Sequence, residues 1–474
     1  MARCYCHWRR LLICLCTPCI LLVLMFIYVT VMVSLNMTAA AGGETSVWVT
    51  KTDRVHFIAS GTYTIEGLAP LPKTFWDPHP HSGALWNHLQ LVIDRHYNPI
   101  LSPKNTERGT INTSHESLLQ QSFSTAHYWE NMTEFAKLPQ QMQNFASNMH
   151  KRDYPILIQP NVTCGAGAEE EEEPPLLLLA IKTTEENYEN RQAIRESWGQ
   201  VGWVAGRRQD SGGGRGESVG KKSGGYVRRV FLLGRTNHKE QGAYTELLQQ
   251  ESQRYGDILQ WDFTDSFFNL TLKDVLFWGW FSHHCDRTHF IFKGDDDIFV
   301  NIPAMIDYLQ DQLQKPKAHK AMRDFMVGDV IGAAQPIREY KSKYFVPASF
   351  YKGFYPAYAG GGGVVYSGLL TKRLNIISKS IHLFPIDDVY VGMCMIRLKA
   401  YPIHNPAFLT FDFPGKEESK PCAYHTILLV HKRIPSQIVT LWARLKDTKT
   451  QCLNVTLRNK TNKHKNRNIA PKKS

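Results

Sequence analysis

Apolar residues occur along this chain in two patterns, one long uninterrupted run and a series of short runs. The long run spans residues 11–35, 25 positions without a charge. At a rise of about 1.5 Å per residue it is long enough to cross a ~30 Å hydrocarbon core. Because Arg3, Arg9 and Arg10 precede it, we expect a single transmembrane signal-anchor with a cytosolic tail at 1–10 and the rest of the chain across the membrane. A cleaved signal peptide is the alternative, although the run exceeds the roughly 7–15 apolar residues of such signals.

From residue 176 onward, apolar runs of strand length alternate with stretches whose apolar residues recur at helical spacing. This alternation predicts an α/β fold with a largely parallel sheet flanked by helices, in which ligands bind beyond the carboxyl ends of the strands. We expect strands at 176–181, 226–234, 258–263, 289–294 and 325–332, and helices at 189–199, 245–256, 271–285, 303–313 and 368–381. Gly199 is expected to end the first helix and Ser367 to cap the last.

The remaining segments differ in composition and suggest the domain organisation. Residues 36–72 are polar and aperiodic and predict a stem, and the aromatic-rich residues 73–173 predict a neck packed on or leading to the main domain at 174–452. Within that domain, residues 206–225 hold eight glycines and predict a flexible loop between a helix and the second strand. Residues 453–474 predict a basic, disordered tail.

The net charge of +12 is concentrated in places, with seven Lys or Arg and no acid at 458–474. Such a tail, like the glycine- and arginine-containing loop, is also typical of nucleic-acid binding. A position across the membrane argues against that function, so we expect solvated segments and no nucleic-acid partner.

Glycosylation sequons and cysteines agree with an oxidising, secretory compartment. Cys164, Cys285, Cys394, Cys422 and Cys452 follow the apolar run, and an odd number leaves at least one thiol free or paired between chains. All N-x-S/T sequons also follow the run. Asn36 is expected to lie too near the membrane for modification, which leaves Asn112, Asn131, Asn161, Asn269, Asn454 and Asn459.

Three consecutive carboxylates, Asp295, Asp296 and Asp297, stand at the end of the expected strand at 289–294. Two carboxylates at ~4 Å repel by roughly 4 kcal/mol at a protein-like dielectric, so a compensating charge is required. The spacing does not match an EF-hand loop. An ion-pair cluster around Lys293 is an alternative, but one lysine does not balance three carboxylates. Oxygen ligands of this kind favour a hard divalent cation that would stabilise a phosphate leaving group.

Six motifs in order resemble those of the β-1,3-glycosyltransferase family, and most those of the β-1,3-N-acetylglucosaminyltransferases that build poly-N-acetyllactosamine. The resemblance covers about residues 75–452. It implies a type II Golgi membrane protein with a lumenal GT-A fold, a Rossmann-like mixed sheet flanked by helices, and a metal-bound UDP-sugar. The motifs are NRQAIRESWG, FFNLTLK, FKGDDDIFVN, YAGGGGVVYSG, FPIDDVYVGMC and CAYHTILLVHKRIP.

The resemblance also implies residue roles in metal and donor binding. Asp295 and Asp297 would hold Mn²⁺ or Mg²⁺ together with His431, and Asp296 would contact the donor ribose or sugar. Arg191 and Arg195 lie four residues apart on one helical face, a spacing that would allow both to reach the uridine or a phosphate.

An inverting transfer needs one base to deprotonate the acceptor hydroxyl and no separate acid, because metal-bound UDP leaves as an anion. Asp388 is the expected base, and Asp387 is the alternative or an acceptor-binding residue. They precede a strand-like VYVG, and a helix cap or turn is the structural alternative. For the acceptor, Tyr358 would stack on galactose, while Gly361 and Gly362 would let the backbone approach a sugar.

The expected function is therefore transfer of N-acetylglucosamine from UDP-N-acetylglucosamine in β-1,3 linkage to the terminal galactose of lactosamine chains on glycoproteins or glycolipids. A β-1,3-galactosyltransferase of the same family and a non-catalytic lumenal partner of an active paralogue are the alternatives. Homo- or hetero-oligomers with related transferases are compatible with either. The chain lacks two neck cysteines of the family, which leaves the rigidity of the neck open. A Cys394–Cys422 disulfide is expected to tie the base loop to the segment carrying His431.

Overall fold

The computed structural model describes residues 84–97, 133–136, 138–161, 174–208, 223–236 and 241–459. The chain divides into two units, Met1–Phe57 and Ile58–Ser474, and every described residue belongs to the second. Among these residues, none of the helices combines the length and the apolar character needed to cross a bilayer. The expected anchor at 11–35 and the stem at 36–72 lie outside the described residues.

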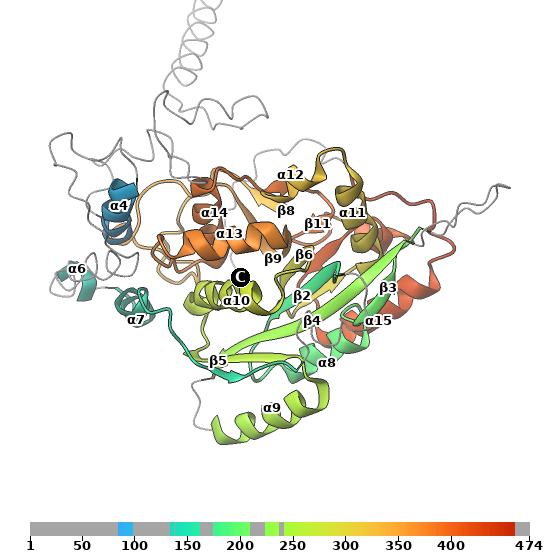
Figure 1. Cartoon of the computed structure of the whole chain (residues 1–474), viewed down its shortest axis with the longest axis horizontal. Coiled ribbons are helices and arrows are strands. Elements are labelled where there is room, and N and C mark those ends of the chain that lie inside the picture. Colours follow the sequence, from blue (N-terminus) through green and yellow to red (C-terminus); the bar gives the residue numbers. More distant parts are fainter. Residues whose placement is uncertain are drawn as a thin grey trace, which may run out of the picture. The chain divides into compact units, whose positions relative to one another are not determined.

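A nine-stranded sheet forms the centre of the described unit, with the order β1-β5-β4-β2-β6-β9-β8-β10 and with β3 paired to β4 (Figure 1). Its strands are β1 (Ile156–Ile158), β2 (Leu177–Lys182), β3 (Gly202–Ala205), β4 (Gly224–Arg235), β5 (Ile258–Thr264), β6 (Phe290–Asp295), β8 (Met326–Ile331), β9 (Tyr358–Ser367) and β10 (Ile403–His404). A small second sheet has the order β11-β12-β7, from β7 (Ile298–Val300), β11 (Phe408–Leu409) and β12 (Leu429–His431).

The sheet is mixed: its middle is parallel, as the sequence predicted for most of the sheet, and at one edge β10 runs parallel to β8. Strands β5, β4, β2 and β6 run parallel, whereas β9 runs antiparallel to both β6 and β8. The parallel strands are the continuous apolar runs, as expected for strands covered on both faces. All six residues of β2 are buried.

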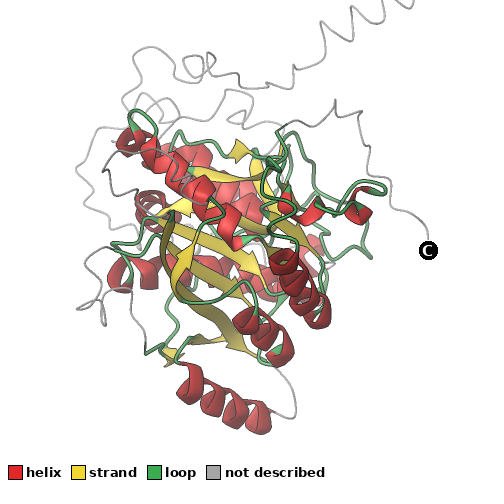
Figure 2. Ribbon diagram, turned by 90° about the vertical axis from the view of Figure 1, so that its right-hand side faces the viewer, coloured by secondary structure: helices red, strands yellow, loops and turns green. Residues whose placement is uncertain are grey.

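Helices cover both faces of this sheet (Figure 2), and the strand residues alternate between two cores. Leu178 and Ala180 of β2 belong to one core, while Leu177 and Leu179 belong to the other, which is the period of two expected for a strand. The first core contains α4 (Leu85–Tyr97), α7 (Gln140–Asn148), α10 (Leu270–His284), α13 (Gly368–Ser378) and α14 (Asp387–Arg397). The second contains α8 (Tyr188–Glu196), α9 (Gln241–Tyr255), α11 (Ile302–Gln314), α12 (Ala318–Met322) and α15 (Pro435–Asp447). A further single turn, α6, spans Thr133–Ala136.

The described part of the neck packs into the first core. The indole nitrogen of Trp86 on α4 donates to the carbonyl of Leu383 at 3.0 Å. Asp94, at the other end of α4, forms an ion pair with Arg397 of α14 at 2.7 Å, and both side chains are buried. These contacts attach α4 to α14, the helix that begins with Asp387 and Asp388.

Two expected local structures differ from those observed. The residues VYVG after Asp388 lie inside α14 and not in a strand, because the two aspartates occupy the first turn of a helix, where carboxylates are favourable. The glycine-rich stretch 206–225 joins β3 to β4, which pair antiparallel. It therefore connects two strands of a hairpin, and its residues 209–222 lie outside the described residues.

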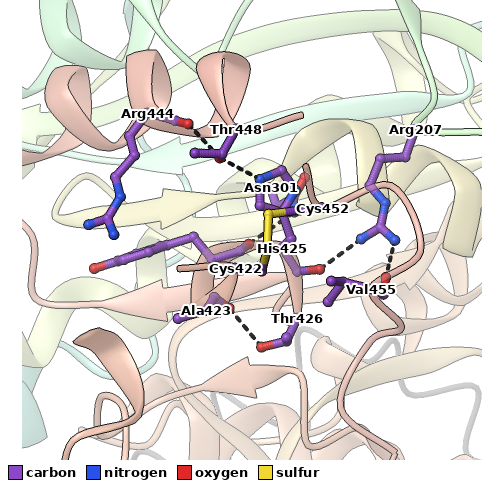
Figure 3. Close-up of a disulfide and its surroundings, with 11 residues drawn as sticks. Arg207, Asn301, Cys422, Ala423, His425, Thr426, Arg444, Thr448, Cys452 and Val455 are labelled. Atoms are coloured by element: carbon purple, nitrogen blue, oxygen red, sulfur yellow. Dashed lines mark hydrogen bonds between the residues drawn. A yellow bond between two sulfur atoms is a disulfide. The ribbon is translucent and has the colours of Figure 1, made fainter. Parts of the chain in front are cut away.

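The disulfide connectivity expected from the sequence is wrong. Cys422 pairs with Cys452, 30 residues further along the chain (Figure 3). Cys394 is a free, fully buried thiol in α14, packed in the first core, whereas Cys422 and Cys452 flank α15 on the opposite face of the sheet. Cys285 is disulfide-bonded as well.

The Cys422–Cys452 bridge is surrounded by contacts that hold the C-terminal segment of the domain. Arg207 lies near the start of the glycine-rich stretch. It donates to the carbonyl of His425 at 2.7 Å and to that of Val455 (Figure 3). The ring nitrogen Nε2 of His425 lies 2.9 Å from the hydroxyl of Thr448. The bridge thus joins the end of α15 to the segment that leads into β12.

Candidate active site

The three consecutive aspartates lie at the turn between the two sheets. Strand β6 ends at Asp295 and β7 begins at Ile298, so Asp296 and Asp297 form the link between them. In the small sheet Ile298 is paired with His431 of β12. This antiparallel register brings a histidine from 134 positions further along the chain beside the aspartates.

Asp295, Asp297 and His431 form a cluster that could hold a metal ion. One ligand atom from each lies within 4.8 Å of the others, and His431 Nε2 lies 3.2 Å from Asp297 Oδ1 and 3.8 Å from Asp295 Oδ2. Two carboxylates and one imidazole suit Mn²⁺ or Mg²⁺ and leave further coordination positions for a ligand. The donor set therefore fits the expected metal.

Electrostatics within the cluster are strongly coupled. Burial tends to raise the pKa of Asp297, but the hydrogen bond and charge of His431 outweigh it and hold the pKa below its usual value. Burial tends to lower the pKa of His431, and the same two aspartates raise it above its usual value. Without a metal, a proton on His431 thus stabilises the carboxylates, a role that a divalent cation can take over.

Asp296 points away from this cluster. Its Oδ2 accepts hydrogen bonds from the hydroxyl of Thr183 at 2.5 Å and from the amide of Asn187 at 2.9 Å. Burial raises its pKa to about 6, against the opposing effect of these two donors. The middle aspartate is therefore held by the loop between β2 and α8, and the outer two remain for the metal.

The second pair of carboxylates, Asp387 and Asp388, lies in the first turn of α14 and divides into two environments. Asp387 is buried, and its Oδ2 lies 2.6 Å from the ammonium of Lys182. Burial alone would raise its pKa, but Lys182 and Lys293 hold the pKa well below the usual range. Asp388 accepts a hydrogen bond from the backbone N–H of Gly361 at 2.9 Å. Burial and the adjacent charge of Asp387 raise the pKa of Asp388 to about 6.

Lys182 connects the two groups of carboxylates. Its ammonium lies 3.1 Å from Asp295 and 2.6 Å from Asp387. In the parallel register of β2 and β6, Lys182 and Asp295 are direct partners. Sequence reasoning missed this lysine. The signal was present, because a charge at the end of an otherwise apolar strand is rarely buried unless it is paired.

The ion-pair alternative requires Lys293 to neutralise the three consecutive aspartates. The structure places its ammonium beside other carboxylates. Its ammonium lies 2.7 Å from Asp274 of α10, 3.5 Å from Asp387 and 3.7 Å from Asp388. The residue is buried in β6 with its side chain directed toward α14. Lys293, the partner in the ion-pair alternative, thus contacts the second group of carboxylates.

The two arginines expected at the donor are paired with carboxylates inside the fold. Arg195 forms ion pairs with Glu251 at 2.6 Å and Asp257 at 2.7 Å, so direct donor binding by Arg195 is not what the geometry supports. Arg191 also pairs with Glu251, at 2.7 Å. Its guanidinium also donates to the carbonyls of Thr184 and Glu185 and to the hydroxyl of Thr183 at 3.3 Å, and that hydroxyl donates to Asp296. Arg191 is thus linked to Asp296 through Thr183.

The glycine run lies in β9, between the metal cluster and the carboxylate pair. Gly361 and Gly362 have positive φ of 58° and 63°. A Cβ on Gly362 would lie 2.9 Å from the ring of His431, and one on Gly361 would collide with Thr410. Their glycine identity is thus explained by contacts within the protein. Tyr358, at the start of β9, is half-buried, and burial together with Asp388 raises the pKa of its phenol.

The expected glycosylation sites differ in how exposed their asparagines are. Asn161, Asn454 and Asn459 are exposed, while Asn112 and Asn131 lie outside the described residues. Asn269 is half-buried and donates to the carbonyl of Thr264 at 2.7 Å. The threonine of its sequon, Thr271, is buried and donates to Phe384.

Comparisons with known proteins show the family of this chain. Residues 189–406 match the family described as Galactosyltransferase. The chain is 38% identical over 396 residues to N-acetyllactosaminide beta-1,3-N-acetylglucosaminyltransferase 2 of Mus musculus, covering 82% of this chain and 91% of that protein. It is 39% identical to N-acetyllactosaminide beta-1,3-N-acetylglucosaminyltransferase 4 of Homo sapiens, over 66% of this chain and 75% of that protein.

A third relative, UDP-GlcNAc:betaGal beta-1,3-N-acetylglucosaminyltransferase 7 of Rattus norvegicus, is 37% identical over 65% of this chain and 72% of its own length. The first of these alignments includes both carboxylate-bearing regions and most of the chain around them. The protein therefore belongs to the galactosyltransferase family, in the group of β-1,3-glycosyltransferases that its motifs resemble.

Proposed function

We propose that this protein is an inverting transferase that moves N-acetylglucosamine from UDP-N-acetylglucosamine to the 3-hydroxyl of a terminal galactose in lactosamine-type glycans. The observation that carries the proposal is the relation between two carboxylate groups of different character. One group, Asp295 and Asp297 with His431, has the ligands of a hard cation. The other supplies Asp388, a carboxyl whose pKa of about 6 suits a general base near neutral pH. Lys182 holds both groups at one place.

The reaction follows from these assignments. The carboxylate of Asp388 takes the proton of the acceptor hydroxyl, whose oxygen forms a bond to the anomeric carbon as the bond from that carbon to the phosphate oxygen breaks. The phosphate oxygen keeps the electron pair, and UDP leaves as an anion. A divalent cation on Asp295, Asp297 and His431 would supply Lewis-acid stabilisation of that charge. Attack from the face opposite the leaving group inverts the configuration and gives a β linkage from an α donor.

The asymmetry between Asp387 and Asp388 selects the base. Asp387 is buried against Lys182, and its lowered pKa makes it a weak proton acceptor. Asp388 has one oxygen held by the N–H of Gly361, and the side chain is 22% exposed, compared with 8% for Asp387. Asp388 is thus the carboxylate that a hydroxyl can reach. Asp387 sets the charge around it.

Donor and acceptor contacts are assigned on the same basis. Asp296, held by Thr183 and Asn187 at the end of β2, is proposed to contact the donor ribose or sugar. Tyr358, which lies close enough to Asp388 for their charges to interact, is proposed to stack on the acceptor galactose. We also propose a GT-A arrangement of the sheet and a Golgi lumenal location, with residues 11–35 as the membrane anchor.

The test is UDP release by the full-length protein in detergent micelles. Turnover with UDP-N-acetylglucosamine, Mn²⁺ and a galactose-terminated lactosamine, with a β-1,3 product by NMR, would support the proposal. Turnover with UDP-galactose instead would assign the sister activity that the family description allows. Folded protein that releases UDP from neither donor, and shows no Mn²⁺-dependent retention on immobilised UDP, would favour the non-catalytic alternative.

A further inference from the structure

Helix α10 places one carboxylate, Asp274, in the core near the proposed base. Asp274 is fully buried, on a helix whose other core-facing side chains are mostly apolar. Its Oδ2 accepts from the ammonium of Lys293 at 2.7 Å. Its Oδ1 is buried and has no hydrogen-bond partner among the described residues. Burying a carboxylate with one oxygen unsatisfied is costly, so this residue requires an explanation beyond packing.

The geometry around Lys293 supplies one. The ammonium faces three carboxylates, and the nearest is Asp274 at 2.7 Å, compared with 3.5 Å for Asp387 and 3.7 Å for Asp388. The side chain of Lys293 is 3% exposed, so water does not compete for the ammonium. The carboxylates therefore set which hydrogen bonds the ammonium forms, and the shortest goes to Asp274 on α10, outside the Asp387–Asp388 pair.

An ammonium that moved into contact with Asp388 would impair a base. A hydrogen bond from a charged donor stabilises the carboxylate form and lowers its affinity for a proton. At present Asp388 receives a hydrogen bond from the neutral backbone N–H of Gly361 and a longer-range attraction from Lys293. Keeping Lys293 at a distance from Asp388 thus preserves basicity.

We propose that Asp274 is a positioning residue for the proposed base: it retains the ammonium of Lys293 on the α10 side and leaves Asp388 free to accept the acceptor's proton. The inference rests on the proposed role of Asp388. It assigns a function to a residue 114 positions away in the chain, and it explains why an unsatisfied carboxylate is tolerated in the core.

Several other groups also act on the pKa of Asp388. Burial and Asp387 raise its pKa, while Lys293, Lys182 and the N–H of Gly361 lower it, with a resulting pKa of about 6. The phenol of Tyr358 on β9 also interacts with it. Of these, only Lys293 has a short contact with a carboxylate of α10.

Asp274→Asn and Lys293→Met test the proposal because they predict opposite shifts. In Asp274→Asn a negative charge is lost and Lys293 is released toward Asp388, so the acid limb of kcat/KM should move down by about one pH unit. Because a base that is about one pKa unit weaker accepts a proton less readily, we expect kcat at pH 7.5 to fall severalfold and by at most about tenfold, with the donor KM within about twofold of wild type. In Lys293→Met the cation that stabilises the carboxylate form of Asp388 is lost, and the acid limb of kcat/KM should move to higher pH.

The double variant Asp274→Asn/Lys293→Met isolates the coupling. It lacks the ammonium of Lys293, and Lys182 keeps its own partner Asp387, so it should lack the downward shift of Asp274→Asn. Asp286→Asn is the matched control, because Asp286 follows α10 and pairs at the surface with Lys372; its pH profile should equal that of wild type. Unfolding curves of each variant show whether the fold is retained.

Shifts in the same direction for both single variants, or an unmoved acid limb in folded Asp274→Asn, would overturn the inference. A wild-type protein without turnover would instead reject the proposed function. In that case the titration of Asp388 is read directly, by ¹³C NMR of aspartate-labelled full-length protein with Asp388→Asn for assignment. A carboxyl resonance of Asp388 whose midpoint is unchanged by Asp274→Asn would then reject the positioning role separately. If Asp274→Asn does not fold, the charge-neutral double variant with an acid limb below that of wild type would also contradict it.

Discussion

The imidazole of His431 lies 3.2 Å from the carboxylate of Asp297. Asp297 directly precedes β7 and His431 ends β12, and these two strands run antiparallel in the three-stranded sheet. Because β12 pairs with β7 immediately after the aspartates, the small sheet holds a candidate metal ligand, His431, beside the carboxyl end of β6. A change that displaces β12 should therefore weaken the cation site even when the aspartates are intact.

Metal binding should depend on this cluster. Mn²⁺ at a hundredfold excess over its Kd should stabilise the wild-type fold by about 2.7 kcal/mol, measured as a rise in Tm. His431→Ala and Asp297→Asn should lose most of this rise, and chelation should abolish activity. Asp311→Asn, which changes an exposed carboxylate paired with Arg208, is the control. A full Mn²⁺-dependent rise in both cluster variants would place the metal elsewhere.

Asp388→Asn should abolish turnover while leaving the fold intact. Loss of a general base costs roughly 10²–10⁴-fold in rate, and the asparagine amide can occupy the same space. Donor affinity, measured by calorimetry with UDP and Mn²⁺, should change little. Asp387→Asn should instead lower both stability and activity, because Lys182 loses its partner at 2.6 Å. A rate for Asp388→Asn within tenfold of wild type would remove it as the base.

The pH dependence separates the two carboxylates. The pKa of Asp388 is raised to about 6, and the base works only as a carboxylate. The rate constant kcat/KM should therefore be flat above about pH 7 and fall roughly tenfold per pH unit below pH 6. The pKa of Asp387 is shifted in the opposite direction. With a base at that position, kcat/KM would therefore stay unchanged as the pH falls to below 4. A profile measured from pH 4.5 to 8.5 decides between them.

Arg195 should contribute to stability and not to donor affinity. Arg195→Met leaves the buried carboxylates of Glu251 and Asp257 without one of their partners, which typically costs about 3–5 kcal/mol in the free energy of unfolding. Denaturant titration would measure the loss. Arg208→Met is the matched control, since its ion pair with Asp311 is about half exposed and such pairs contribute ~1 kcal/mol or less. A donor KM raised more than tenfold in folded Arg195→Met would restore the direct role.

The disulfide should stabilise the C-terminal part of the domain. Bridging a separation of 30 residues restricts the unfolded chain by an amount worth about 3–4 kcal/mol. Cys422→Ala/Cys452→Ala should lose about that much in a denaturant titration, whereas Cys394→Ala should leave the bridge unchanged. Peptide mapping under non-reducing conditions tests the connectivity directly. A cross-linked peptide containing Cys394 would contradict it.

Much of the element order follows from the sequence alone. The expected strands at 176–181, 226–234, 258–263 and 289–294 correspond to β2, β4, β5 and β6 within one or two residues, and Ser367 caps α13 as expected, accepting from the N–H of Leu370. Buried parallel strands and strongly amphipathic helices carry their signal within some ten residues. The exceptions were short or polar: β3 and β1 have three or four residues, too few for a periodic pattern.

Only part of the candidate site could be predicted from the sequence in the same way. Three adjacent aspartates at the end of a strand indicate a cation by charge repulsion alone. His431 and the two carboxylates of α14 were assigned through the resemblance to a family. Nothing in the sequence separated Asp387 from Asp388 by environment, since both are flanked by the same apolar residues.

The sequence by itself determined the elements and the accumulation of negative charge at one strand end, because hydrophobic periodicity and charge are local properties of the chain. The tertiary structure decided the partners. Lys182 meets Asp387 across 205 residues, Arg195 pairs with Glu251 and Asp257, and Cys422 pairs with Cys452. These pairings depend on strand register and on which face of the sheet each helix covers, and both are set by the packing of the whole domain.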